Sequence, residues 1–148
     1  MLTKATEYAI RGLVAIEINN KKGLRPGFKK IAREVDAPEP YMGKILQTLT
    51  RHDLIKSVRG RGGGFFFDDE SKELTLYEVI VVMEGMRFFT KCGFGFKHCD
   101  ASNPCPVHNE FQQIRDAFTD LVKNETIQSL ARKIENGEAV LNRLKHNN

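Results

Sequence analysis

All three cysteines of this 148-residue chain fall within residues 92–108, together with two of its four histidines. The stretch reads CGFGFKHCDASNPCPVH. Its glycine, asparagine and proline content is typical of a loop. An odd, clustered set of cysteines in a chain without a secretion signal indicates metal or redox chemistry rather than a disulfide framework.

Four interpretations of Cys92, Cys99 and Cys105 are open. Zinc sites favour cysteine pairs two to four residues apart, whereas six and then five residues separate these three. A disulfide would leave one thiol over, and inert cysteines are expected in buried elements rather than in a loop. An iron–sulfur cluster takes soft thiolates from backbone that can wrap around it, and this is the interpretation that we favour.

Three thiolates leave a cluster one ligand short. His108 follows Cys105 by three residues and would place an imidazole at the start of the next helix. Glu7 is its rival, because a carboxylate on an apolar helix stripe is costly unless it is paired or coordinated. His98 ranks third, because it adjoins Cys99 and ligation by neighbours is strained. Imidazole is softer than carboxylate, which favours His108 over Glu7.

The N-terminal half contains the elements that must position a functional surface. A helix is predicted from a Thr3 cap to about residue 19. It carries two apolar stripes, and the second, which includes Glu7, needs a partner from another segment or another protomer. Two short helices, about 28–35 and 40–51, are joined by a proline-containing turn, which is the pattern of a helix-turn-helix. The stripe predicted to be buried in the second of them is Tyr41, Ile45, Leu46 and Leu49.

Two β-prone runs, 55–58 and 65–67, flank the glycine-rich segment RGRGGG and predict a hairpin, or wing, after the helix-turn-helix. The segment lacks the Gly-Lys-Ser/Thr ending of a nucleotide-binding loop. Residues 25–61 hold nine Lys and Arg against four acids, a net charge of +5, which favours a phosphate-facing surface. We therefore predict that double-stranded DNA is bound by residues at the start of the second helix and on the wing, namely Glu39, Tyr41, Gly43, Lys44, Arg59 and Arg61.

The C-terminal half predicts helices that pack and dimerise. Thr75 and Glu78 form a capping box that opens one helix, and a second capping box is predicted at Asn109. A final helix near residues 127–134 is predicted to stop at Gly137, ahead of a polar tail that frays toward residue 148. The helix after Asn109 carries a coiled-coil-like apolar seam that favours a homodimer, formed by Phe111, Ile114, Phe118 and Leu121.

The predicted fold is mainly α with a small β-hairpin wing, a winged helix-turn-helix followed by C-terminal dimerisation helices. The chain is 41% hydrophobic but has no apolar run long enough for a membrane helix, and its N-terminus does not resemble a signal peptide, so we expect a cytoplasmic protein. It shows no His-Glu-x-x-His, nucleophile elbow or Cys-x-x-Cys, so we expect no enzyme. The alternative function is an iron–sulfur or zinc redox or electron-carrier protein without DNA binding.

Three segments resemble the Rrf-type winged helix-turn-helix regulators, which include IscR- and NsrR-like members. The segments are TKATEYAIRGL, KKIAREVDAPEPYMGKILQTLTRHDLIKSVRGRGGGFFF and LTLYEVIVVMEG, and the wing is the most specific of them. The resemblance covers nearly the whole chain and implies a dimer that binds palindromic operators and controls transcription, as an NsrR-like repressor does. In some members a [2Fe–2S] or [4Fe–4S] cluster senses iron–sulfur status, nitric oxide or redox state on three cysteines, matched here by Cys92, Cys99 and Cys105.

The resemblance also bears on the fourth ligand and on domain organisation. His108 matches the histidine after the third cysteine in IscR-like members, and Glu7 matches an N-terminal acid that reaches the other subunit's loop in NsrR-like members. The chain departs from the usual pattern, because six residues separate its first two cysteines where five are common. We divide it into a DNA-binding domain (1–85), a cysteine-rich cluster-binding loop (86–108) and a dimerisation helix with a C-terminal helix (109–148).

Overall fold

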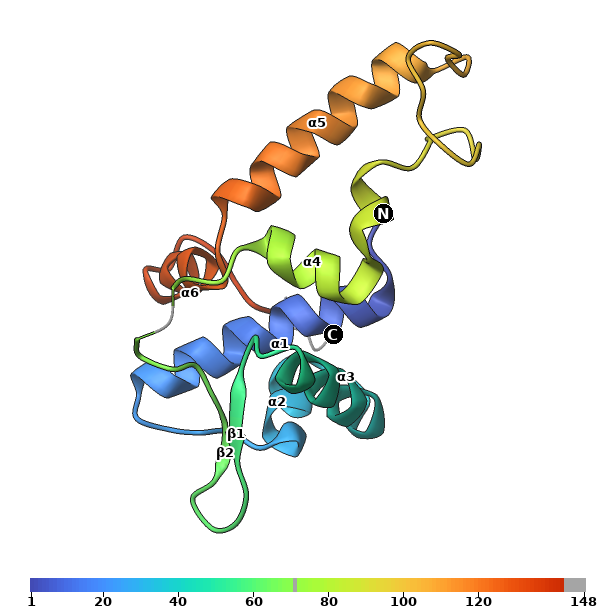
Figure 1. The fold of residues 1–148 in the computed structure, drawn as a ribbon. Helices are drawn as coiled ribbons and strands as arrows, with labels where there is room; N and C mark the ends of the chain where they lie inside the picture. Colours follow the sequence, from blue (N-terminus) through green and yellow to red (C-terminus); the bar gives the residue numbers. More distant parts are fainter. Residues whose placement is uncertain (71, 143–148) are drawn as a thin grey trace, which may run out of the picture.

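A computed structural model describes residues 1–70 and 72–142 of the chain. It is mostly helical with one two-stranded antiparallel hairpin, which confirms the predicted fold class (Figure 1). The end of the tail that was predicted to fray after Gly137, residues 143–148, lies outside the described residues. In chain order the elements are α1 (Lys4–Lys21), α2 (Phe28–Glu34), α3 (Glu39–Arg51), β1 (Lys56–Val58), β2 (Gly64–Phe66), α4 (Leu76–Glu84), the 3-10 helix η1 (Met86–Phe89), α5 (His108–Asn124) and α6 (Ile127–Glu135).

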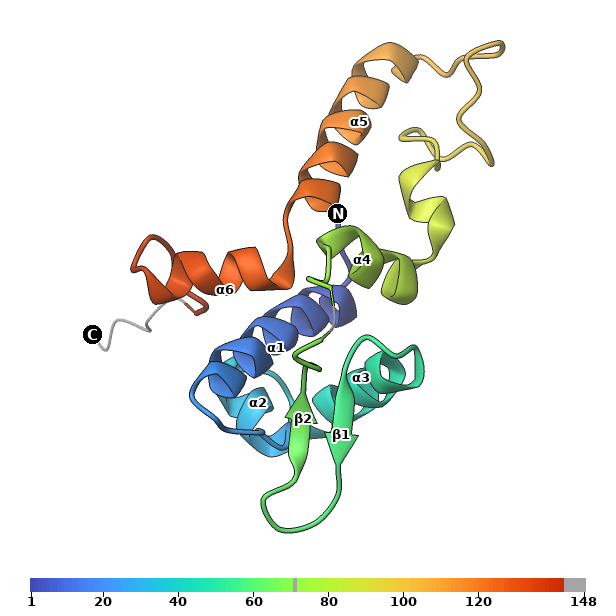
Figure 2. The same ribbon diagram turned by 60° about the vertical axis from the view of Figure 1, so that its left-hand side comes forward.

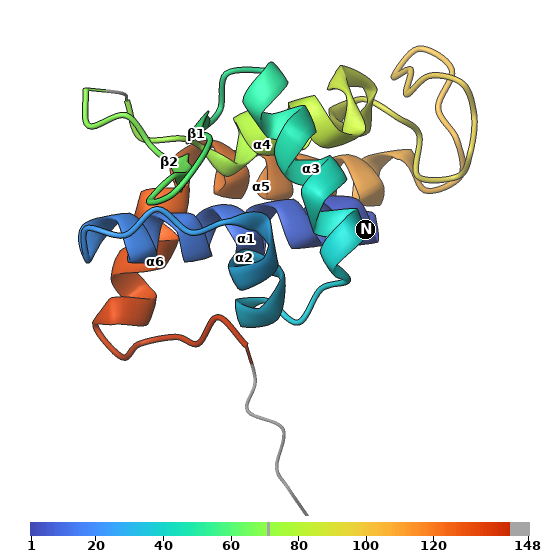
Figure 3. The same cartoon turned by 90° about the horizontal axis from the view of Figure 1, so that it is seen from below.

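Helix α1 forms the centre of the fold and packs against α2, α3, α4 and α6 (Figure 3). Thr3 caps it as predicted, because its side chain accepts a hydrogen bond from the backbone N–H of Thr6. Both apolar stripes are covered within the chain, since Ile10 packs against a small cluster around Ile80 of α4 and Val122 of α5. The partner that the second stripe needs is therefore another segment of the same chain.

Helices α2 and α3 form the helix-turn-helix. Pro40 lies in the first turn of α3, as predicted. The prediction that Tyr41 is buried was wrong, because Tyr41 is 39% exposed. Its neighbour Met42 is fully buried beside Gly12 of α1 instead. The inward face follows the helical spacing of three, four and seven residues from position 42, not from position 41, and consists of Met42, Ile45, Leu46 and Leu49.

The hairpin is fastened to the helical body at its base. Strand β1 pairs with β2 in antiparallel register, with Val58 opposite Gly64. Phe65 of β2 donates its backbone N–H to the carbonyl of Pro26, 2.9 Å away, in the connection between α1 and α2. The side chain of Asn20 donates to the carbonyl of Phe65 and accepts from the backbone N–H of Phe67. These bonds hold the wing at a fixed place beside the helix-turn-helix.

The residues that precede α4 and α6 are hydrogen-bonded to each other, so the two helices begin side by side. The backbone N–H of Leu76 donates to the carbonyl of Glu125, and that of Ile127 donates to the carbonyl of Leu74, so residues 75 and 126 form an isolated antiparallel bridge. The predicted capping box at Thr75 is confirmed. Helix α6 ends just before Gly137, as predicted, and packs on α1 through Ile127 and Ala131.

Between α4 and α6 the chain makes an arm of η1, the cysteine loop and α5, which projects away from the wing (Figure 2). The capping box predicted at Asn109 was wrong. Helix α5 already begins at His108, and Val107, the residue before it, has no side-chain group that could cap a helix. The cysteine loop contacts the first turn of α5 instead, since the ring of Phe111 packs against Gly93.

Glu84, the last residue of α4, fastens the start of α1. Its Oε1 accepts hydrogen bonds from the backbone N–H of Thr3 (2.9 Å) and from the hydroxyls of Thr3 (2.8 Å) and Thr6 (2.6 Å). Partial burial opposes ionisation of this carboxyl, but the bonds from Thr6 and Thr3 outweigh it and lower its pKa. The ionised carboxylate therefore stabilises the folded chain.

We predict that Glu84→Ala lowers the free energy of unfolding by about 1–2 kcal/mol at neutral pH, the usual worth of hydrogen bonds to one charged group. The loss is fully present above the pKa of a free glutamate and disappears as the pH falls through the lowered pKa of the folded state. Urea unfolding at neutral and acidic pH measures both, with the exposed Glu138→Ala as control. A loss that does not change with pH would contradict a role for the ionised form.

Candidate functional site

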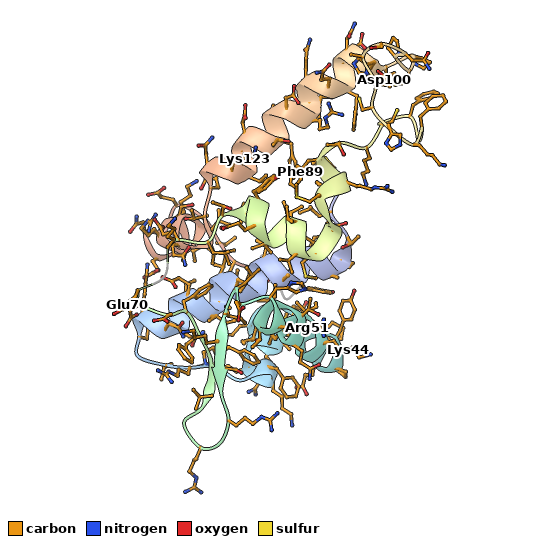
Figure 4. The ribbon with its side chains drawn as sticks, in the orientation of Figure 1. Lys44, Arg51, Glu70, Phe89, Asp100 and Lys123 are labelled. Carbon is orange, nitrogen blue, oxygen red and sulfur yellow. The ribbon has the colours of Figure 1, made fainter. Side chains whose placement is uncertain are left out.

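The residues predicted to bind DNA lie on α3 and on the wing. Lys44 is exposed and points away from the body, on the same helix as Arg51 (Figure 4). Glu39, at the start of α3, is also exposed. Gly43 is half-buried because the ring of Phe28 lies over it, at 3.6 Å from where a side chain would begin. The remaining predicted residues are Tyr41 beside it on α3, and Arg59 and Arg61, both exposed in the turn between β1 and β2.

A cationic aromatic cluster that the sequence did not reveal adjoins the start of α3. Tyr41 packs edge-on against Tyr8 of α1, with ring centroids 5.8 Å apart. Lys4 and Arg11 each approach the ring of Tyr8 to 5.9 Å. Sequence reasoning assigned Tyr8 to a core stripe of α1, so the cluster could be found only once α1 and α3 were placed together. It extends the basic surface from α3 onto α1.

Gly64 allows the wing to lie close to the helical body. Its φ is +153°, and a side chain there would begin 2.2 Å from the carbonyl oxygen of Arg25. At that distance the backbone must move. The guanidinium of Arg25 also stacks on the ring of Phe66 in β2, with 3.9 Å between the guanidinium carbon and the centre of the ring. The glycine run is therefore needed for packing at its end as well as for the turn.

We predict that Gly64→Ala lowers the free energy of unfolding by about 1–3 kcal/mol, the cost of one strained backbone position. Thermal unfolding of the two proteins measures the loss. Gly43→Ala is the matched control, because Gly43 has no positive φ and the added carbon would meet only the ring of Phe28, at an ordinary 3.6 Å. Equal stability of the two variants would show that the wing does not depend on this close approach.

The cysteine loop folds around a cavity of about 330 Å³. All three cysteines contribute to its wall, and Cys92 is the buried one, while the other two are half-buried. The Sγ of Cys99 lies 3.3 Å from Nδ1 of His108, the first residue of α5. Asp100 lies at the outer end of the arm, close to the start of α5 (Figure 4). Of the predicted ligands, the cavity wall includes Cys92, Cys99, Cys105, His108 and His98.

His108 is 7% exposed, and its Nε2 is buried without a hydrogen-bond partner among the described residues. Such a nitrogen is costly unless something binds it. Three thiols and one imidazole around a single cavity are the soft donor set that iron–sulfur clusters and zinc prefer. The residues present therefore suit a soft-metal group, with Cys92, Cys99, Cys105 and His108 as its holders.

The loop backbone also polarises the thiols. The N–H of Phe94 points at Sγ of Cys92 from 3.3 Å. This bond, with further help from the N–H of Phe96 and the neighbouring Cys105, lowers the pKa of Cys92. Burial raises the pKa of Cys105, and the nearby Cys92 adds to the rise. Cys92 therefore ionises more readily than Cys105.

The donors are not gathered on one point. In the part of the chain that the structure describes, no three His, Cys, Asp or Glu side chains are placed to hold a single metal ion. A mononuclear zinc site needs all its donors within about 2.3 Å of one atom, whereas a cluster spreads its ligands over several irons. Glu7 is not brought to this cavity, since it lies on α1, 43% exposed, with Lys4 at 3.4 Å.

The order of α2, α3 and the β1–β2 hairpin defines the chain as a winged helix-turn-helix protein. Residues 2–133 match the Rrf2 family, described as iron-dependent transcriptional regulators, and the chain belongs to that family. It is accordingly a DNA-binding transcriptional regulator and not an enzyme, which confirms the resemblance seen in the sequence. Among the described residues, the helices are too short or too polar to span a bilayer.

Individual relatives agree with this placement. Protein aau3 of Rhizobium meliloti (strain 1021) is 33% identical over 132 residues, covering 88% of this chain and 84% of its own. The transcriptional regulator IscR of Pectobacterium atrosepticum is 26% identical over 141 residues, covering 95% and 82%. CymR, the global cysteine regulator of B. subtilis, shares the fold with a TM-score of 0.72 at 22% identity, covering 89% and 96%. The IscR of T. potens does so with a TM-score of 0.71 at 18% identity, covering 95% and 92%.

Proposed function

We propose that this chain is a homodimeric regulator that binds a double-stranded DNA operator in the cytoplasm. In this proposal it senses iron–sulfur status, nitric oxide or redox state through a cluster on Cys92, Cys99 and Cys105. The observation that carries the proposal is the single cavity, at the outer end of the arm, that these thiols share with His108. When bound, the cluster supplies iron chemistry that responds to the signal.

Residues 1–85 serve as the DNA-binding part of this proposal. The start of α3 enters the major groove, and the exposed Arg59 and Arg61 reach the minor groove or the phosphates beside it. Two features support the assignment, namely the exposure of Lys44 and the cationic aromatic cluster next to Tyr41. Glu39 and Gly43 complete the predicted contact surface, although the ring of Phe28 partly covers Gly43.

Residues 109–148 contain the proposed dimer interface, of which α5 forms the contact. Ile114 is 60% exposed and Leu121 is 55% exposed, two turns apart on one side of α5. Phe118, predicted in the same seam, instead packs near Phe88 of η1, with centroids 5.9 Å apart. Two exposed large apolar residues on one side of a helix support a contact with a second copy of the chain. This contact would use Ile114 and Leu121, the exposed members of the predicted seam.

In this proposal residues 86–108, the cysteine loop, connect cluster binding to dimerisation and so to DNA binding. The loop leads directly into α5, so the arrangement of the thiols and the direction of α5 depend on each other. If α5 meets its counterpart in a dimer, a change in the loop alters the separation of the two recognition helices. An operator with two half-sites responds to that separation.

The proposal is tested with protein purified without oxygen and a duplex selected from a random-sequence library. Iron and sulfide analysis, the visible spectrum and sedimentation give cluster content and oligomeric state. DNA affinity should fall steeply with salt, with a log–log slope of about −6 to −10 for a dimer that grips many phosphates. A flat salt dependence would contradict the DNA contact, and colourless protein after reconstitution would contradict the cluster.

A further inference from the structure

One face of α3 carries three long, exposed polar side chains in a row. Lys44, Gln47 and Arg51 follow one another at spacings of three and four residues, so they form a single stripe along the helix. This stripe lies opposite the buried face with which α3 packs on the core. Figure 4 labels the residues at its two ends, Lys44 and Arg51.

The polar groups of this stripe are free to meet a ligand. In the part of the chain that the structure describes, none of the three side chains has a hydrogen-bond or ion-pair partner. Thr48 lies beside them, but its hydroxyl already donates to the backbone carbonyl of Lys44, 3.1 Å away. Gln47 carries the only side-chain amide in α3. The stripe therefore presents three different free groups, an ammonium, a carboxamide and a guanidinium.

We infer that Gln47 is a base-reading residue, and that it binds an adenine close to a guanine bound by Lys44. A carboxamide forms two hydrogen bonds with N6 and N7 of adenine in the major groove, whereas an ammonium donates to O6 and N7 of guanine. The inference rests on the proposed placement of α3 in that groove. It adds a residue to the predicted contact surface and states which bases the operator must hold.

The positions of these residues along α3 determine what each of them reaches. Base-reading residues of recognition helices follow one another at spacings of three and four along a single face, and Gln47 lies three residues after Lys44. Side chains at that spacing are about 5–6 Å apart, and base pairs are stacked about 3.4 Å apart. The two bases are therefore on neighbouring base pairs or one pair apart. Arg51, the last residue of α3, lies over the phosphates instead.

The first test is a selection of bound duplexes from a random-sequence library, made with the full-length protein purified without oxygen. We expect the natural protein to select half-sites with a guanine and an adenine within three consecutive base pairs. Gln47→Ala should keep the guanine and lose the preference for adenine, a loss of about 5–150-fold in discrimination against the other bases at that position. Arg51→Ala is the matched control, because losing a phosphate contact weakens binding to every sequence and leaves the selected motif unchanged.

The second test changes the DNA instead of the protein. The selected adenine is replaced with 7-deazaadenine, which lacks the N7 acceptor, and affinity is measured by fluorescence anisotropy. The replacement should weaken binding by the natural protein and by Arg51→Ala, and it should cause no further loss for Gln47→Ala. An equal loss for the natural protein and Gln47→Ala would overturn the inference, as would a motif that Gln47→Ala selects unchanged. A selection that yields no sequence preference at all would contradict the placement of α3 and the inference together.

Discussion

Replacing His108 with alanine is expected to shorten the lifetime of the reconstituted cluster in air by about 10–100-fold, the usual cost of disturbing a metal ligand or its support. The visible spectrum should change as well. The reason is geometric, since His108 lines the thiol cavity, lies 3.3 Å from Cys99 and has a buried ring nitrogen without a partner. Lifetime is measured as the decay of visible absorbance after exposure to air.

Glu7→Ala is the matched comparison, because Glu7 was the competing candidate for the fourth ligand. Within one chain Glu7 lies outside the cavity and faces Lys4. The variant should therefore retain both spectrum and lifetime. His98→Ala controls for loss of a histidine that also lines the cavity. If Glu7→Ala loses the cluster while His108→Ala keeps it, the fourth ligand comes from α1 of a second copy.

Replacing both Arg59 and Arg61 with alanine is expected to produce the largest loss of DNA affinity. Each side chain should contribute about 1–3 kcal/mol if it reads a base and less if it touches only phosphate. Both are exposed in the wing turn, and the base of the wing is held by the bonds to Pro26 and Asn20. The two arginines are thus presented on a rigid support, and their losses should add approximately.

Fluorescence anisotropy with the selected duplex, at several salt concentrations, separates the two roles. A phosphate contact lowers affinity for every sequence and reduces the salt slope by about one for each charge removed. A base contact lowers affinity for the selected duplex more than for random DNA. Arg87→Ala, exposed on η1 in the arm, is the control that should leave both quantities unchanged. Unchanged binding by the double variant would exclude the wing from the interface.

Local signals in the sequence predicted most of the element boundaries. The capping residues Thr3 and Thr75 predicted the starts of α1 and α4, and Pro40 predicted the first turn of α3. The start of α5 was misplaced by two residues, with the cap predicted at Asn109 and found at Val107, because no capping side chain stands there. Where a helix end depends on local chemistry the sequence suffices, and where it depends on packing the sequence does not.

The faces of helices were harder to predict than their ends. In α3 both position 41 and position 42 begin an acceptable apolar stripe, and the choice depends on Gly12 of α1, which leaves room for Met42. The same dependence hid the contact between Tyr41 and Tyr8. Neither residue pair is close in the chain, so only the packing of α1 against α3 decides between the two patterns.

The thiol cavity could be anticipated, because its three cysteines are clustered in the chain and loops bring such neighbours together. Arg115 could not. An arginine in the middle of an amphipathic helix is ordinarily solvated, and nothing in its neighbours indicates that Nη1 of Arg115 is buried without a hydrogen-bond partner among the described residues. That property arises from η1 and α5 enclosing one space, which the sequence does not describe.

The bridge between Thr75 and Thr126 joins the two ends of one excursion of the chain. Helix α4 packs on α1 directly after this bridge, and residues 85–124 then leave the body and return to it at Thr126, so this arm can change in length or chemistry while its two ends stay fixed. The helix-turn-helix and the wing precede this bridge in the chain, and α6 packs on the core after it. Such a layout makes the arm an exchangeable unit of the fold, because its residues can be replaced without moving the helix-turn-helix or the wing.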